Sequence, residues 1–469
     1  MFALFSASAV RRRRAARLAA AALVSGLIAT GSLAGAGMAA ADDGTQHQGG
    51  AVATLDGLKT FDKALLHNDG ESKEIAAGLF EMTVDGGGQL KTYCIDIHNP
   101  TQSQAKYLET PWDQTSLRTN KDAGKIRWIL QHSYPQVDDL AELAKGAKAG
   151  SLTAETAAAG TQVAIWRFSD GADVTAVDPA AEKLADWLEK SAQDLAEPTA
   201  SLSLEPNAVS GKAGSRLGPV TVRTDAGQVT VTPPADAAAS GVKITDEAGK
   251  PLTSAVDGSK LYFDVPAGAA DGTASLTAQA TMSVPVGRAF ASASKSQTQI
   301  LAGSSQSTVS ATATATWAKT GAIPSVTAEK NCAKGGVDIT AGNKGDSPFT
   351  FELAGIKHTI PAGESRTVTV PVAEDQAYDF TITGPGGFEK NFKGVLDCKT
   401  AGTPQPGTET PSSQPSPASA GGTSGGSEGD LAETGGSSAT PMIAGIAIVL
   451  VLIGGGAVFF LRKKSAAGE

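Results

Sequence analysis

The chain has 469 residues, a formal net charge of −9, 54 glycines, 23 prolines and only 5% aromatic residues. This composition favours several β-rich domains with flexible spacers over one large enzyme core. The acidic balance argues against a nucleic-acid-binding protein, which normally carries a basic surface. Three cysteines and five histidines, without a CxxC or HExxH pattern, indicate neither a metal site nor a cofactor.

Residues 1–41 have the layout of a secretory signal peptide. Arginines 11–14 and Arg17 form a basic segment, an apolar stretch covers residues 18–33, and Ala39-Ala40-Ala41 offers a cleavage site. The alternative is an uncleaved membrane anchor. Export would place the chain in an oxidising environment, where cysteines pair.

Residues 42–198 are predicted to form an α+β domain. Strands are expected over residues 74–84 and 89–97, followed by helices. One helix is indicated by Ile126, Ile129 and Leu130. A second begins at Asp178-Pro179, a favourable N-cap and first-turn pair, and its apolar face is formed by Leu184, Trp187, Leu188 and Leu195. Four of the five tryptophans lie in this region, which indicates the best-packed core of the chain.

The next two regions alternate apolar and polar residues, as β-strands do. Residues 199–323 are interpreted as a β-sandwich spacer, with strands near 220–223, 229–231, 261–265 and 307–316. Residues 324–400 are interpreted as an Ig-like sandwich, with strands near 337–340, 349–353, 366–370 and 378–382. Cys332 and Cys398 bracket this second unit, and we expect a disulfide between them.

The C-terminal part is expected to hold a stalk and an anchor. Residues 401–430 are rich in Pro, Gly and Ser and cannot bury a core, so they are predicted to be a disordered stalk. Residues 441–461 are apolar and long enough for a transmembrane helix. Residues 462–464 are basic and would stay in the cytoplasm.

The segment before this span carries a short motif, Leu431-Ala432-Glu433-Thr434-Gly435. Motif, apolar span and basic tail together resemble the LAxTG sorting signal of Gram-positive wall proteins of the actinobacterial type. The resemblance implies that a sortase cuts between Thr434 and Gly435 and joins Thr434 to peptidoglycan. The alternative is a permanent one-helix membrane anchor.

Cys94 has no cysteine partner in this scheme, which in an exported protein is worth explaining. It could be a small buried apolar residue. It could also be the nucleophile of a surface cysteine acyltransferase or hydrolase, with His98 or His132 as its base.

A third interpretation comes from Thr161-Gln162-Val163-Ala164-Ile165-Trp166 together with Tyr93-Cys94. The two segments, in this order, resemble the thioester (TQxA) domains of Gram-positive surface adhesins, although Ile95 follows Cys94 where some members carry a second Tyr. The resemblance covers roughly residues 50–197. It implies an internal thioester between Cys94 and Gln162 that captures an amine, such as a lysine, on a target surface.

The residue pattern agrees with the resemblance. Gln162 and Trp166 are four residues apart, so on a helix they share a face, and Trp166 is expected to pack beside the glutamine. His98 and His132 are candidates for assisting proton transfer. The overall prediction is a multidomain wall protein in which an α+β thioester domain precedes two all-β Ig-like sandwiches, a disordered stalk and a transmembrane sorting helix. It would act once per molecule; a passive structural wall protein is the remaining alternative.

Overall fold

The computed structural model describes residues 49–399 except 69 and 293. The predicted signal peptide, stalk, LAxTG motif and transmembrane helix all lie outside these residues. Within the described part, no helix has both the length and the apolar character needed to cross a membrane.

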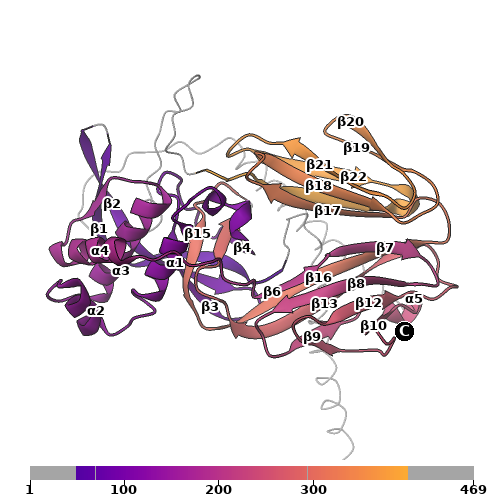
Figure 1. Ribbon diagram of the computed structural model, residues 1–469, viewed down its shortest axis with the longest axis horizontal. Helices are drawn as coiled ribbons and strands as arrows, with labels where there is room; N and C mark the ends of the chain where they lie inside the picture. The colour runs from indigo at the N-terminus through magenta and orange to yellow at the C-terminus, as the bar shows by residue number, and fades with distance from the viewer. Residues whose placement is uncertain (1–48, 69, 293, 400–469) are drawn as a thin grey trace, which may run out of the picture. The chain divides into compact units, whose positions relative to one another are not determined.

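The first region is built on a sheet with the strand order β2-β3-β15-β14-β4-β1-β5 (Figure 1). An additional β1–β2 pairing closes six of these strands into a ring. The strands are β1 (Val52–Asn68), β2 (Glu71–Val84), β3 (Gln89–Cys94), β4 (Lys106–Thr110), β5 (Val174–Ala176), β14 (Ala289–Ser292) and β15 (Gln299–Ser304). The predicted strands over residues 74–84 and 89–97 are present; the second ends at Cys94.

Two strands of this ring come from far along the chain. β14 pairs with β4, and β15 pairs with β3, all antiparallel. Both strands lie within residues 199–323, the segment interpreted as a separate spacer. The ring that contains Cys94 therefore extends across the expected domain boundary at residue 198.

Helices follow β4. They are two 3-10 turns, η1 (Trp112–Gln114) and η2 (Ser116–Arg118), and four α-helices, α1 (Ala123–Gln131), α2 (Leu140–Ala147), α3 (Ala154–Ser169) and α4 (Pro179–Ser191). Asp178 caps α4 as predicted, because its side chain accepts hydrogen bonds from the N–H groups of Ala180 and Ala181. Leu195, assigned to this helix from its spacing, lies beyond its end.

Helix α3 is the central helix. Its residues 157–166 are all buried, and it packs on β1, β2 and α4. Gly160 permits the close approach of α4, because a Cβ at this position would lie 2.5 Å from the carbonyl oxygen of Ala181. A capping box formed by Thr153 and Thr156 fixes the start of α3.

The second region consists of two sheets, ordered β10-β12-β8-β6 and β11-β9-β13-β16-β7. Their strands are β6 (Leu202–Glu205), β7 (Ala208–Lys212), β8 (Arg216–Thr224), β9 (Val229–Thr232), β10 (Lys243–Thr245), β11 (Ser254–Ala255), β12 (Lys260–Asp264), β13 (Gly272–Ser283) and β16 (Gln306–Ala318). A short helix, α5 (Ala237–Ser240), precedes β10. The hairpin β14–β15 leaves this region between β13 and β16, and one continuous apolar core runs through residues 51–317.

The third region has its own apolar core between Val326 and Phe388. Its strands are β17 (Pro324–Asn331), β18 (Gly336–Asn343), β19 (Phe349–Leu353), β20 (Ile356–Ile360), β21 (Ser365–Pro371), β22 (Ala377–Thr383) and β23 (Glu389–Val395), with a 3-10 turn, η3 (Pro385–Gly387), before the last. The predicted disulfide between Cys332 and Cys398 is present and joins the segments that follow β17 and β23. Both regions are largely built of β-strands, as expected, with α5 as a short helix in the second.

Candidate functional site

Cys94 is the last residue of β3 and is a free, fully buried cysteine. The register of β3 and β15 places it opposite Gln299. The N–H of the next residue, Ile95, donates to the carbonyl of Thr298. Since hydrogen-bonded and non-hydrogen-bonded pairs alternate in an antiparallel ladder, the N–H and C=O of Cys94 point away from β15.

The Gln162 carboxamide satisfies both of these backbone groups. The Cys94 N–H donates to Oε1 at 3.0 Å, and Nε2 donates to the Cys94 carbonyl at 2.8 Å. Strand β2 pairs with β3 only as far as Phe80 and Thr92, so the carboxamide makes the hydrogen bonds to Cys94 that continued β2–β3 pairing would make. Gln162 is 0% exposed, and the structure thus brings together the two residues that the sequence singled out.

The same arrangement prepares the carboxamide for attack. The Cys94 N–H lies on the oxygen that would carry negative charge in a tetrahedral intermediate, which is the function of an oxyanion hole. Helix α3 holds Gln162 on the Cys94 backbone, so little conformational freedom is left to lose. Trp166 is 0% exposed on the same helix.

Burial raises the pKa of the Cys94 thiol well above its ordinary value, and the carboxyls of Asp96 and Asp170 raise it further. The Asp96 backbone and the Trp166 indole act in the opposite direction. The sulfur contacts Asp96 twice, with the carbonyl oxygen at 3.1 Å and the N–H at 3.2 Å. At rest the thiol is therefore protonated, and a nearby base must remove its proton before attack.

Three carboxyls lie in this neighbourhood: Asp96 is buried, and Asp170 and Asp397 are half-buried. Burial raises the pKa of Asp96 well above its ordinary value, and the nearby Asp397 and Asp170 carboxyls add to the effect. Burial likewise raises the pKa of Asp170 to about 7 and that of Asp397 to about 6. Carboxyls that titrate near neutral pH are suited to proton transfer.

The two predicted histidines take no part in the hydrogen bonds between Cys94 and Gln162. His132 is exposed and stacks on Trp128 with ring centroids 4.0 Å apart. His98 is half-buried, and burial lowers its pKa. Among the described residues, no hydrogen bond joins either histidine to Cys94 or Gln162.

Asp96 and Asp170 are the residues that sequence analysis missed. Asp96 stands two positions after Cys94, and Asp170 caps the C-terminal end of α3, so both are close to a motif residue in sequence. Their significance depends on burial, since exposed aspartates are common. A further acidic cluster consists of Glu374, Asp375 and Asp397. Their carboxylate oxygens lie within 4.8 Å of one another, and among the described residues this cluster could hold a cation.

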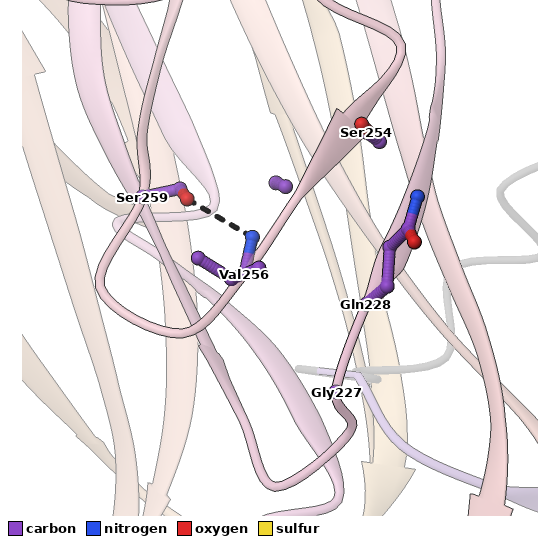
Figure 2. Close-up of a pocket in the computed structure, with 6 residues that line it drawn as sticks. Gly227, Gln228, Ser254, Val256 and Ser259 are labelled. Carbon is purple, nitrogen blue, oxygen red and sulfur yellow. Dashed lines mark hydrogen bonds between the residues drawn. The ribbon is translucent and has the colours of Figure 1, made fainter.

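A surface hollow of about 340 Å³ lies in the second region (Figure 2). It is lined by small and uncharged residues: Gly227, Gln228, Ser254, Ala255, Val256 and Ser259. It contains no nucleophile paired with a base and none of the residues around Cys94.

Comparison with known families points to the same two residues, Cys94 and Gln162. Residues 91–194 match the thioester domain family. The matched segment contains both Cys94 and Gln162. Residues 324–395 match a second family, described as the C-terminal domain of bacterial phospholipase C.

Solved structures give weaker likenesses. The Bacillus anthracis TIE protein is 15% identical, with 74% of this chain and 81% of that chain covered and a TM-score of 0.27. The thioester domain of the Enterococcus faecium TIE86 protein is 15% identical, with 57% and 97% covered and a TM-score of 0.26. The E. coli chaperone DraB is also 15% identical, with 42% and 98% covered and a TM-score of 0.18. TM-scores this low do not establish a common fold, and no curated protein matches the chain.

The raised pKa of Asp170 predicts a pH-dependent stability. Its pKa is about 7 in the folded chain against 3.8 for the unperturbed group, so the folded state keeps a proton that the unfolded chain has lost between these values. Stability should therefore fall as pH rises from 4 to 7. We expect Asp170→Asn to leave the melting temperature unchanged at pH 4 and to raise it at pH 8, measured by thermal unfolding. A pH-independent difference would contradict this account.

Proposed function

We propose that this protein is a secreted, wall-anchored surface adhesin whose thioester domain captures a target amine covalently. The observation that carries the proposal is the pair of hydrogen bonds between the Gln162 carboxamide and the Cys94 backbone. The match of residues 91–194 to the thioester domain family supports it. Export, LAxTG sorting and attachment to peptidoglycan by a sortase belong to the proposal on the strength of the terminal sequence signals.

The thioester bond forms in an intramolecular reaction between the two side chains. A base removes the thiol proton of Cys94, and the sulfur attacks the side-chain carbonyl carbon of Gln162. The Cys94 N–H holds the oxyanion, and the amide nitrogen takes up the proton and leaves as ammonia. The products are the thioester and one ammonia, so the mass of the chain falls by that amount.

Capture reverses the chemistry with a different amine. The amine nitrogen attacks the same carbonyl carbon, the carbon–sulfur bond breaks, and Cys94 returns to a thiol. The product is an amide between Gln162 and the target, or an isopeptide bond if the target is a lysine. Since Gln162 is consumed, each molecule reacts once.

Burial of the site suits a reactive ester. Cys94 and Gln162 are both 0% exposed, which keeps water from the thioester until a target amine arrives. The proposed advantage is attachment that is released only when a covalent bond breaks.

Intact mass of the secreted chain, residues 42–434, tests the proposal. We expect the wild type to be lighter by one ammonia, beyond the loss from the disulfide, and to gain one equivalent of methylamine. Cys94→Ala and Gln162→Ala should show neither change, whereas Gln131→Ala, at an exposed glutamine, should behave as the wild type. A wild-type mass that fits free Cys94 and intact Gln162 would sink the adhesin mechanism. An acyl-transfer activity that survives Gln162→Ala would instead favour a cysteine acyltransferase.

A further inference from the structure

Two segments run side by side next to Cys94. Residues 95–102 follow β3, and residues 296–299 lead into β15. Three hydrogen bonds join them: the Ile95 N–H to the Thr298 carbonyl at 3.0 Å, the Gln297 N–H to the Pro100 carbonyl at 3.2 Å, and the Gln102 N–H to Ser296 Oγ at 2.9 Å.

Buried polar atoms without a partner concentrate on these two segments. In the described part of the chain nine such side-chain atoms occur, and five belong here: Asp96 Oδ1, Thr101 Oγ1, Gln297 Oε1 and Nε2, and Gln299 Nε2. Gln297 and Gln299 are 0% exposed, and Asp96 is 1% exposed. A buried polar group without a partner destabilises the folded state, so such a concentration needs an explanation.

The register places one of these groups on the face of Cys94. Gln299 is the cross-strand partner of Cys94, and the side chains of such a pair lie on the same face. Thr92 Oγ1 donates to Gln299 Oε1 at 3.0 Å and fixes the amide, which leaves Nε2 as an unused donor.

Acidic groups surround the same segments. Asp170 Oδ1 accepts the Ile97 N–H at 3.1 Å, and Thr298 Oγ1 donates to Asp397 Oδ2 at 2.8 Å. Asp96 uses one carboxylate oxygen for Asn99 and keeps the other free. Lys330 is the basic group whose charge acts on Asp397. Three carboxyls against one lysine favour the binding of a cation between these two segments.

We propose that Asp96, Thr101 and Gln297 form a recess that binds the primary ammonium group of the target beside the Gln162 acyl carbon. An ammonium has three donors, and the recess offers three unused acceptors: Asp96 Oδ1, Thr101 Oγ1 and Gln297 Oε1. The inference rests on the proposed thioester and adds to it the side chains that hold the incoming ammonium, Asp96, Thr101 and Gln297.

The recess also supplies the proton balance of capture. The Asp96 carboxylate takes one proton from R–NH₃⁺ and leaves R–NH₂, which attacks the thioester carbonyl. The carbon–sulfur bond breaks, and the second nitrogen proton goes to the Cys94 sulfur. The Asp96 N–H already donates to that sulfur at 3.2 Å, and the unused Gln299 Nε2–H on the same face is a further donor as the sulfur leaves. The products are the amide, the Cys94 thiol and protonated Asp96, which then returns its proton to solvent.

Rates of thioester cleavage test the recess. The thioester form of the secreted chain, identified by its mass, is treated with methylamine, which is cationic at pH 7.5, and with hydroxylamine, which is neutral there. In the wild type we expect the methylamine rate to saturate with concentration and the hydroxylamine rate to stay linear. Loss of a charge-assisted hydrogen bond in Asp96→Asn should slow methylamine at least about tenfold and leave hydroxylamine nearly unchanged.

Controls separate this inference from the proposed thioester. Asp138→Asn removes an exposed carboxylate and should react as the wild type. If Asp96→Asn does not form the thioester, the methylamine and hydroxylamine rates are compared in Gln297→Met instead. A wild type without the thioester mass defeats the proposed function itself. A wild-type thioester with a linear methylamine rate, or variants that slow both nucleophiles equally, overturns the recess alone.

Discussion

A chain that ends at residue 198 is expected not to fold, although this boundary encloses both thioester motifs. Strands β14 and β15, residues 289–304, fill the gap between β3 and β4 in the six-stranded ring. Without them, both strands expose unpaired edges, and the strand that ends at Cys94 loses one of its two partners. The apolar core is also cut, because it runs continuously from residue 51 to residue 317.

Urea unfolding followed by circular dichroism measures this effect. We expect the fragment 42–323 to unfold cooperatively and the fragment 42–198 to show no cooperative transition. The loss would be the whole stability of the domain, about 5–15 kcal/mol for an ordinary one. A cooperative transition of equal midpoint in the shorter fragment would show that the hairpin is dispensable.

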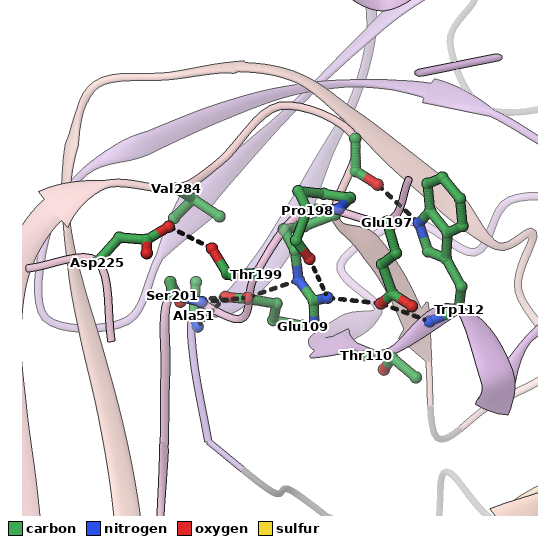
Figure 3. A network of polar contacts seen from close by, with 12 residues as sticks. Ala51, Glu109, Thr110, Trp112, Glu197, Pro198, Thr199, Ser201, Asp225 and Val284 are labelled. Carbon is green, nitrogen blue, oxygen red and sulfur yellow. Dashed lines mark hydrogen bonds and ion pairs between the residues drawn. The ribbon is translucent and has the colours of Figure 1, made fainter. Parts of the chain in front are cut away.

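Arg288→Met is expected to destabilise the same region strongly, because it leaves a buried charge unpaired. The Glu109 side chain is 0% exposed and that of Arg288 is 4% exposed, with Nε and Oε1 2.9 Å apart. Glu109 also accepts hydrogen bonds from the Ala51 and Ser201 backbones, at 3.0 and 2.9 Å (Figure 3). Arg288 further pairs with Glu197, whose carboxylate accepts the Trp112 N–H.

This network ties β4, the linker before β6 and the start of β14 together. Breaking a buried pair by removing one partner typically costs about 3–5 kcal/mol. We expect a loss of that size in the free energy of unfolding, measured by urea titration. Arg288→Met combined with Glu109→Gln should be less destabilised than Arg288→Met alone, because no buried charge then remains.

An exposed pair provides the matched comparison. Lys106 and Asp85 lie 2.7 Å apart, but their side chains are 63% and 49% exposed. Lys106→Met should therefore change stability little, because solvent screens such pairs. If Arg288→Met and Lys106→Met have equal effects, the buried network does not stabilise the domain as argued.

The tertiary structure decided several features that local patterns do not encode. Strands β14 and β15 are buried on both faces, so they lack the apolar–polar alternation by which a strand is recognised. Strand β1 was not predicted, and its buried positions change from odd residues (53, 55 and 57) to even ones (64 and 66), so no single alternation runs along it.

The sequence by itself determined the parts of this protein whose signals are local: helix α4 with its Asp178 cap and many strands of the two C-terminal regions. The disulfide followed from the cysteines that bracket the last region, and the pairing of Cys94 with Gln162 followed from the family resemblance. The resemblance to thioester domains named these two residues, and the structure adds that one ends a strand while the other lies on a helix that packs against it. Only the tertiary structure decided that residues 296–299 adjoin Cys94, that Asp96 is buried there and that Asp170 is half-buried beside it. The contact from Thr92 to Gln299 spans 207 positions, and neither a pairing over such a separation nor the burial it creates leaves a periodic signal in the chain.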